Sequence, residues 1–260
     1  MNQPESSKAA LFSLPFSPAP AGERRHELSA IWWLWLPIAF FLLRYAVSIV
    51  SDKQGGLESL MDGELGIVEN LTVLLLLAAM VGSIVLIRKY RNEFKLPPKA
   101  FLIIFSLGCL YFAGEEASWG QHWVGWETGQ YFAEINDQNE TNFHNTSKYL
   151  DRVPKGIVSL AVFLGGLAIP LYLRRTNKVI DQGKPLWWLF PTWVCVPTSI
   201  VAVAATWPSK IERATDSVFY FDGAQEMKEL YIAYFFLLYI VSLGRRLQQY
   251  RASGTRFSAI

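Results

Sequence analysis

The sequence predicts an all-α protein, a polytopic transmembrane helix bundle of about six spans, on three observations. The 260 residues are 52% hydrophobic and 15% aromatic, and the apolar residues gather in long runs. A helix that crosses a hydrocarbon core of about 30 Å needs about 20 such residues, which is the length of these runs. The segments between the runs alternate along the chain between basic and acidic composition.

Six apolar runs are expected to cross the membrane. In chain order they are Ala30–Val50, Gly66–Ile87, Ala100–Trp119, Gly156–Leu173, Pro185–Thr206 and Leu230–Leu243. Pro191 and Pro197 are expected to kink the fifth of them. The transmembrane domain covers residues 28–250, between a polar cytoplasmic tail of residues 1–27 and a short cytoplasmic tail of residues 251–260.

The basic residues orient the bundle, because Lys and Arg are enriched in the cytoplasmic loops of membrane proteins. With the N-terminus inside, 16 of the 24 Lys and Arg residues lie on the cytoplasmic side and 7 on the outer side, and Arg44 lies within a span. Of the 22 acidic residues, 17 fall on or near the outer side. The sequence therefore predicts both termini in the cytoplasm, and the net charge of +2 gives no indication of nucleic acid binding.

Two adjacent glutamates lie toward the end of the third span. Glu115 and Glu116 follow Lys99 after about 15 residues, or about 22 Å of helix, so both carboxyl groups should lie below the outer membrane interface. A carboxylate there costs at least about 2.5 kcal/mol and indicates a functional site. Arg44 lies at a similar depth and is expected to pair with one of the two glutamates. The alternative is that this ion pair only holds helices together.

The longest outer segment, residues 117–155, carries the other polar candidates. A helix continuing past Glu116 would place Ser118 and His122 on the face of Glu115, with His122 about 10 Å further along the axis. Downstream, polar residues recur at every second position: Asn136, Gln138, Glu140, Asn142 and His144. An extended segment would turn all five to one face, whereas a helix would set Glu140 and His144 four residues apart.

The helical alternative suggests a metal site. His144, Glu140 and Glu116 together would offer an imidazole and two carboxylates, which suit Zn²⁺, Fe or Mn²⁺. The alternative is a hydrated loop whose amides cap its turns. Three further acids lie near the outer ends of spans: Glu69 on the second, and Glu226 and Glu229 at the start of the sixth. They are expected either to join the pocket of Glu115 and Glu116 or only to stabilise the N-terminal ends of their helices.

The motifs resemble a group of uncharacterised bacterial polytopic membrane proteins with the signatures GEExSWGQ and NxQxETNxHN. The matching residues are Gly114-Glu115-Glu116, Ser118-Trp119-Gly120-Gln121, and Asn136, Gln138, Glu140-Thr141-Asn142, His144-Asn145. The resemblance also implies that Gln121 is a binding residue of this site. The resemblance implies one shared site and a location in the bacterial inner membrane, and it implies no activity.

Three functions fit these features. The favoured hypothesis is a membrane-embedded enzyme, a hydrolase or transferase, that acts from the outer face on a lipid or lipid-linked substrate. In it, Glu115 or Glu116 acts as general acid or base, because burial favours the neutral carboxyl group. His144 and Glu140 polarise the substrate or hold a divalent metal. The alternatives are an accessory subunit of a larger membrane complex and a proton- or ion-coupled carrier.

Overall fold

The computed structural model describes residues 28–50, 60–61, 65–94, 96–136, 138–176, 188–207, 210–211, 214 and 223–252, which contain helices and no strands. The longer elements are η1 (Ile31–Trp35), α2 (Leu36–Val50), α4 (Ile67–Lys89), α5 (Leu96–Glu116), α8 (Lys148–Phe163), η4 (Leu164–Ala168), α9 (Ile169–Thr176), α11 (Val196–Ala204) and α13 (Ala224–Ala252). Shorter ones are η2 (Ser118–Gly120), α6 (Gln121–Val124), α7 (Gln130–Ile135), η3 (His144–Thr146) and η5 (Trp193–Cys195). The expected tail of residues 1–27, and residues 253–260, lie outside the described residues.

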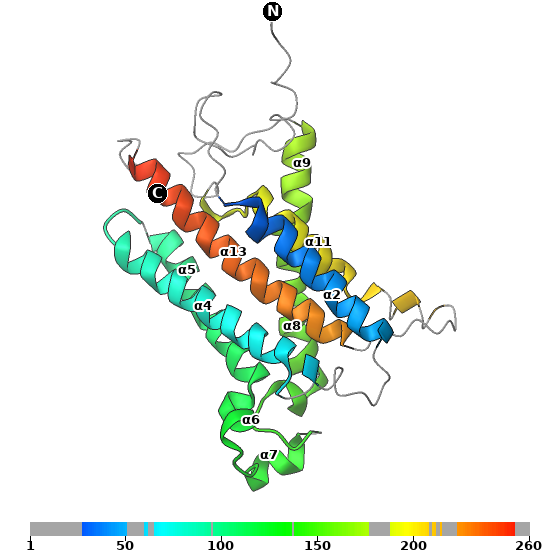
Figure 1. Cartoon of the computed structure of the whole chain (residues 1–260). Helices are drawn as coiled ribbons and strands as arrows, with labels where there is room; N and C mark the ends of the chain where they lie inside the picture. The colour runs from blue at the N-terminus through cyan, green and yellow to red at the C-terminus, as the bar shows by residue number, and fades with distance from the viewer. Residues whose placement is uncertain are drawn as a thin grey trace, which may run out of the picture.

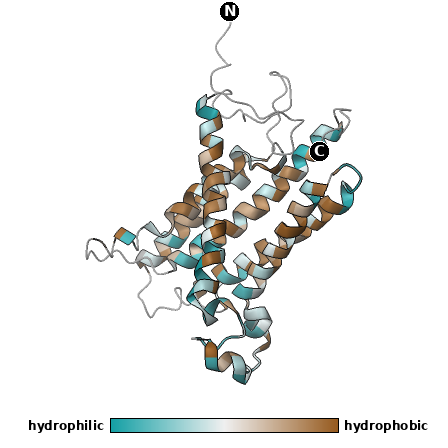
Figure 2. Ribbon diagram, turned by 180° about the vertical axis from the view of Figure 1, so that it is seen from behind, coloured by the Kyte–Doolittle hydropathy of each residue, from teal (hydrophilic) through white to brown (hydrophobic). Residues whose placement is uncertain are grey.

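Five helices in the described part of the chain are long and apolar enough to cross a membrane. They are Ile31–Ser48, Ile67–Lys89, Leu96–Glu116, Lys148–Thr176 and Ala224–Ala252. The fifth expected span contains a shorter apolar helix, Trp193–Ala204. Outward-facing side chains such as Leu74, Ile104 and Ile157 are 62–68% exposed. Apolar residues on all sides of a helix are typical of a bilayer environment, so the predicted all-helical membrane protein is confirmed at this level (Figure 2).

The central helix of the bundle is α13. In its most apolar window 61% of the residues are buried, against 17–33% in the other four membrane-length helices. Helices α4 and α11 pack on α13, α5 packs on α4, and α2 packs on α11 (Figure 1). Helix α8 packs against α11 and α13. Helices α6 and α7 lie beyond the bundle at one end, opposite α9 and the C-terminal end of α13 (Figure 1).

One glycine allows three helices to approach closely. Gly166 lies in the π-helical turn η4, which joins α8 to α9. A Cβ atom there would lie 2.1 Å from Ser199 Oγ of α11 and 2.6 Å from the Phe235 ring of α13. Both distances are too short for any non-bonded contact, so only glycine fits this crossing of α8, α11 and α13.

The fourth and sixth spans begin earlier in the chain than expected. Helix α8 starts at Lys148, where the Ser147 hydroxyl caps it by accepting a hydrogen bond from Tyr149 N at 3.2 Å. The irregular part of the outer segment therefore ends at Ser147 and not at residue 155. Helix α13 starts at Ala224, which places Glu226 and Glu229 within its first two turns.

The fifth span differs in another way. Pro191 precedes its helix, and Pro197 lies in the first turn of α11, where a missing backbone N–H leaves no hydrogen bond unmade. The expected kink at Pro197 is therefore wrong, because this proline marks where α11 begins. At Pro191 the chain does break, between the helical residues 188–189 and η5.

Candidate functional site

The chain turns sharply where α5 ends. Ser118 and Trp119 have φ values of 43° and 57°, and Gly120 has 104°. The left-handed region is costly for residues with a Cβ, so this turn stores strain that its contacts must offset. The expectation that the helix continues from Glu115 through Ser118 to His122 is wrong, because α5 stops at Glu116.

The turn folds Trp119 back over the last turn of α5. Its ring lies so close to Gly114 that a Cβ there would be 2.8 Å from the indole. The indole Nε1 then donates to Glu115 Oε1 at 2.9 Å. The glycine, the glutamate and the tryptophan of the GEExSW motif therefore act as one packing unit.

Glu115 is 3% exposed and accepts hydrogen bonds from several donors. Besides Trp119, the backbone N–H groups of Phe143 and His144 donate to Oε2 at 2.8 Å each. The His144 ring Nδ1 lies 3.3 Å from the same oxygen. A buried carboxylate needs such donors in place of water. Glu115 thus ties residues 143–144 of the outer segment to the end of α5.

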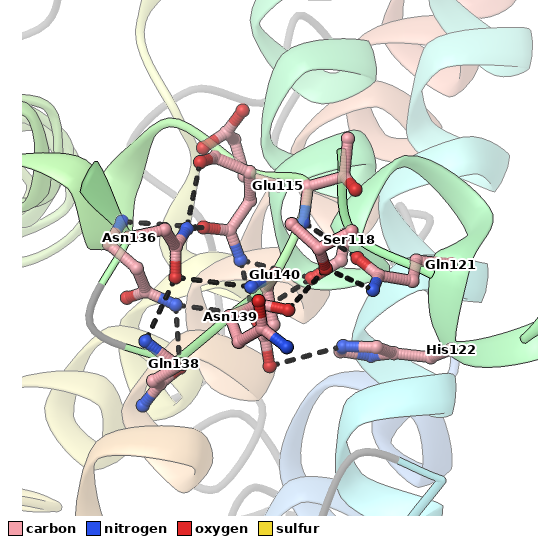
Figure 3. A network of polar contacts seen from close by, with 12 residues as sticks. Glu115, Ser118, Gln121, His122, Asn136, Gln138, Asn139 and Glu140 are labelled. Carbon is pink, nitrogen blue, oxygen red and sulfur yellow. Dashed lines mark hydrogen bonds and ion pairs between the residues drawn. The ribbon is translucent and has the colours of Figure 1, made fainter. Parts of the chain in front are cut away.

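The amide-rich motif makes a second set of contacts around Glu140. The Ser118 hydroxyl donates to Glu140 Oε2 at 2.9 Å, and the side-chain amides of Asn142 and Asn145 donate to the same oxygen. Asn142, which is fully buried, also donates to Ser118 Oγ at 3.0 Å and accepts from Asn136 Nδ2 at 2.8 Å. The polar groups of this network satisfy one another (Figure 3).

Backbone contacts complete the network. Asn136 Oδ1 accepts from the backbone N–H groups of Gln138 and Glu140 at 2.9 and 3.2 Å, which is an Asx turn. Gln121 Oε1 accepts from Thr141 N at 2.6 Å, and Gln121 Nε2 donates to Thr128 Oγ1 at 2.8 Å. The expectation of loop amides that cap turns describes Asn136 and Asn142, whose Oδ1 accepts from Asn145 N at 3.4 Å.

His122 faces Glu140. Its Nε2 lies 3.3 Å from Glu140 Oε1, and its side chain is 7% exposed (Figure 3). The next residue, Trp123, donates from Nε1 to Asn70 Oδ1 of α4 at 2.9 Å. The short helix α6 is thereby attached both to the Glu140 network and to the bundle.

Glu116 points to a different group of residues. The charged groups that act on it most strongly are Glu229, Lys155, Glu69 and Glu226, from α13, α8 and α4. Lys155 Nζ lies 3.0 Å from Glu229 Oε1 and 2.9 Å from Asp151 Oδ1. Glu116, Lys155 and Glu229 line a cavity of about 20 Å³ between α4, α5, α8 and α13.

His144 adjoins this charged cluster. Its ring, with Glu115, Glu116, Asp151 and Lys155, lines a smaller cavity of about 10 Å³. Each of the two cavities has room for about one water molecule. The expected convergence of span-three carboxylates with His144 is therefore present in the structure, as are Glu69, Glu226 and Glu229 around Glu116.

The expected metal ligands do not come together. No group of three His, Cys, Asp or Glu side chains within the described residues has the spacing of a metal site. Residues 139–143 form neither a helix nor a strand, and Asn139 has a φ of 57°. This backbone turns Glu140 toward His122, while His144 turns toward Glu115. The set of His144, Glu140 and Glu116 as ligands of one metal is thus not supported.

Arg44 does not have the expected place beside the glutamates. It is fully buried on α2, which packs on α11, and its Nη1 donates to Ser48 Oγ. The cation that acts on Glu116 is Lys155 of α8. The order of the helices explains the difference. Helix α5 packs on α4, α4 on α13, and α13 on α11, so α4 and α13 lie between α5, which carries Glu116, and α11, on which the α2 helix of Arg44 packs.

Sequence reasoning missed Lys155, because the fourth span was expected to begin at residue 156. A signal was available in the segment Ser147–Asp151, in which a capping serine precedes an acidic residue of the first helical turn. Read as a helix start, it places Lys155 one turn below Asp151 and inside the bundle. The role of Trp119 in holding Glu115 had no such signal, because it depends on the positive φ values of the turn.

Comparisons with protein-family models, with curated proteins and with solved structures find no match to this chain. The resemblance to bacterial membrane proteins thus stays an expectation from the motifs. A functional proposal therefore rests on the geometry of the site, in which Glu115 and Glu116 have different surroundings.

Proposed function

We propose that this protein is a membrane-embedded enzyme that hydrolyses, or transfers a group from, an ester of a lipid or lipid-linked substrate at the outer face of a bacterial inner membrane. The observation that carries this proposal is the position of His144. Glu115 holds its Nδ1 at 3.3 Å, while the ring lines the same cavity as Glu116 and Lys155.

A carboxylate at Nδ1 gives an imidazole a defined role. It favours the tautomer with a proton on Nδ1, which leaves Nε2 free to accept a proton, and it stabilises the imidazolium that results. Glu115 is a positioning residue in this scheme, because it acts through His144. Its additional bonds to the backbone N–H groups of residues 143 and 144 fix the whole segment in place.

The reaction follows from the neighbours of His144. The imidazole takes a proton from a water or alcohol, and the resulting oxygen nucleophile attacks the acyl carbon or phosphorus of the ester. Lys155 stabilises the negative charge that develops on the attacked group. Glu116, when protonated, gives its proton to the departing oxygen, so that proton and electron pair are both accounted for. A cavity with room for one water molecule suits hydrolysis, and the ester itself would reach the cavity from between the helices.

We also propose six spans with both termini in the cytoplasm. The charge distribution supports this arrangement, with 16 basic residues on one side and 7 on the other. It places α6, α7 and the cluster around Glu116 on the outer side. The sixth crossing would be made by the short helix Trp193–Ala204 together with its flanking residues.

The test is turnover of lipids by the purified, full-length protein. It would be incubated in vesicles of bacterial lipid extract, and the products would be identified by mass spectrometry. We expect products that accumulate with wild type, and a rate lower by about 100-fold or more for His144→Gln, which is the usual loss when a general base is removed. Glu116→Gln should lower the rate as well.

His122→Gln is the matched control, because His122 also faces a glutamate but contacts the Glu140 network instead of the cavity. It should retain most of the activity. An unchanged rate in His144→Gln, or an equal loss in both histidine variants, would contradict the assignment of His144.

A second candidate function is that of an accessory subunit. The observation in its favour is that the buried side chains of Ser118, Asn136, Glu140 and Asn142 direct their hydrogen bonds to one another, which holds the outer segment in one conformation. Co-purification with a fixed partner from native membranes, together with an unaffected partner complex in His144→Gln, would favour this function over the enzyme.

A further inference from the structure

A separate groove runs between α8, α11 and α13. Its volume is about 320 Å³, many times that of the cavities beside Glu116. Its walls are mostly apolar, and none of the described residues that line it is acidic. Its lining residues include Leu160, Val203, Thr206, Ile232, Lys210 and Lys228.

The two lysines lie at one end of the groove. Lys228 is one helical turn before Ile232 on α13, toward the start of that helix. Lys210 is one turn beyond Thr206, to whose carbonyl its backbone N–H donates at 3.3 Å. Helices α8 and α13 begin at the end of the bundle where α6 and α7 are found (Figure 1). Lys228 lies in the second turn of α13, whereas Leu160 lies about three turns along α8. Val203 lies in α11, one turn before Thr206.

We propose that this groove binds one anionic phospholipid, with its phosphate between Lys210 and Lys228 and an acyl chain along Leu160, Val203 and Ile232. The charges of the groove and of such a lipid are complementary. Two ammonium groups, with no carboxylate among the described lining residues, attract an anion, and each lysine near a membrane surface favours anionic over neutral lipid severalfold. The apolar walls match the chain, since a groove of this size can enclose much of one acyl chain.

The groove also adjoins the charged cavity. Lys228 and Ile232 line both spaces, so they form the wall between them. A head group held at Lys228 would lie next to Glu116 and Lys155. An anionic phospholipid is therefore the substrate class that we assign to the enzyme, an assignment that rests on the proposed function, whereas the binding itself does not.

Binding can be measured without turnover. The full-length protein in detergent would be mixed with phosphatidylglycerol or phosphatidylcholine, and retained lipid would be counted by native mass spectrometry. Wild type should retain phosphatidylglycerol about 10-fold more than phosphatidylcholine, and Lys210→Gln/Lys228→Gln should bring the ratio close to one. Val203→Trp should reduce retention of both lipids by filling the groove.

Lys148→Gln/Arg152→Gln is the matched control, because it also removes two positive charges. Both residues are exposed in the first two turns of α8, and neither lines the groove. It should keep the wild-type ratio. The proposal is overturned if the Lys210/Lys228 variant keeps that ratio, if the control loses it equally, or if inorganic phosphate alone displaces the lipid. Retention of the lipid with no turnover would uphold the site and count against the enzyme, so the two failures are distinguishable.

Discussion

Glu115 and Glu116 are neighbours in sequence with opposite surroundings. Successive residues of a helix point about 100° apart, so the two carboxylates leave α5 in different directions. Glu115 meets the donors of Trp119 and of the backbone at residues 143 and 144. Glu116 meets the charges of Lys155 and Glu229. The first is therefore suited to positioning His144, and the second to proton transfer.

Gly114 should be essential to this arrangement. Gly114→Ala places a Cβ 2.8 Å from the Trp119 ring, which must move and weaken its hydrogen bond to Glu115. We expect a loss of about 1–3 kcal/mol, the usual cost of overpacking a buried contact. It would appear as a lower midpoint of thermal unfolding in detergent.

Gly108→Ala provides the control within the same helix, since a Cβ at Gly108 has nothing within 4 Å. It should be neutral or slightly stabilising, because alanine favours helix by about 1 kcal/mol relative to glycine. Equal midpoints for the two variants would show that the contact between Gly114 and Trp119 carries no weight.

At this scale the sequence indicated which acidic residues lie deep, but not what they contact. The depth of Glu115 and Glu116 follows from the length of their span. Their partners follow from the positive φ values of Ser118 and Trp119, which no residue-type rule predicts for amino acids other than glycine. The expected pairing with Arg44 failed for the related reason that depth alone does not give the order of helices around the bundle.

At the scale of elements, the conformation of the outer segment depends on Asn142. It joins Ser118, Glu140 and Asn136, and it is fully buried. Asn142→Leu should remove one donor from Ser118 Oγ and from Glu140 Oε2, and one acceptor from Asn136 Nδ2, at a cost of about 1–3 kcal/mol. Amide hydrogen exchange in the segment from Ser118 to Thr146 should then be faster by roughly 10- to 100-fold, while exchange in α4 stays unchanged.

Gln130→Ala is the comparison for that variant. Gln130 is exposed on α7, and its side-chain amide donates to Glu134 Oε1 of the same helix at 3.1 Å. Its exchange pattern should match wild type. Protection that persists in Asn142→Leu would mean that the contacts of Glu115 hold the segment without the amide network.

The ends of elements were predictable only in part. Hydropathy located the apolar centres of α8 and α13, and it could not include their first turns, because those carry Lys155, Glu226 and Glu229. Helices with polar first turns are recognised by their caps instead of by hydropathy. The metal set failed because it required a helix from Glu140 to His144, whereas these residues form the irregular loop that was the alternative expectation.

For the whole molecule, the short helix Trp193–Ala204 decides the topology. With six crossings, reporter fusions after Gln130 should be active outside the cell, and fusions after Phe94, Asp181 and Ser253 should be inactive. If the short helix does not cross, Asp181 stays inside and Ser253 becomes active. A strong signal at Ser253 would therefore reduce the bundle to the five long helices.

The overall class follows from the sequence because span length and hydropathy reflect the thickness of the bilayer. The arrangement of spans does not, since it depends on side-chain contacts such as that of Gly166 with Ser199 and Phe235. The central position of α13 was equally hidden, because its polar residues make it the least apolar of the five membrane-length helices, although it is the most buried of them.

The central claim is that Glu115 acts through His144. A double-mutant cycle on lipid turnover tests it, with Glu115→Gln, His144→Gln and the double variant compared by kcat/KM. Residues that act as a unit are strongly non-additive, so we expect a large loss for each single change and no further loss in the double variant beyond that of His144→Gln. Losses that multiply, or a Glu115→Gln enzyme as active as wild type, would contradict the claim.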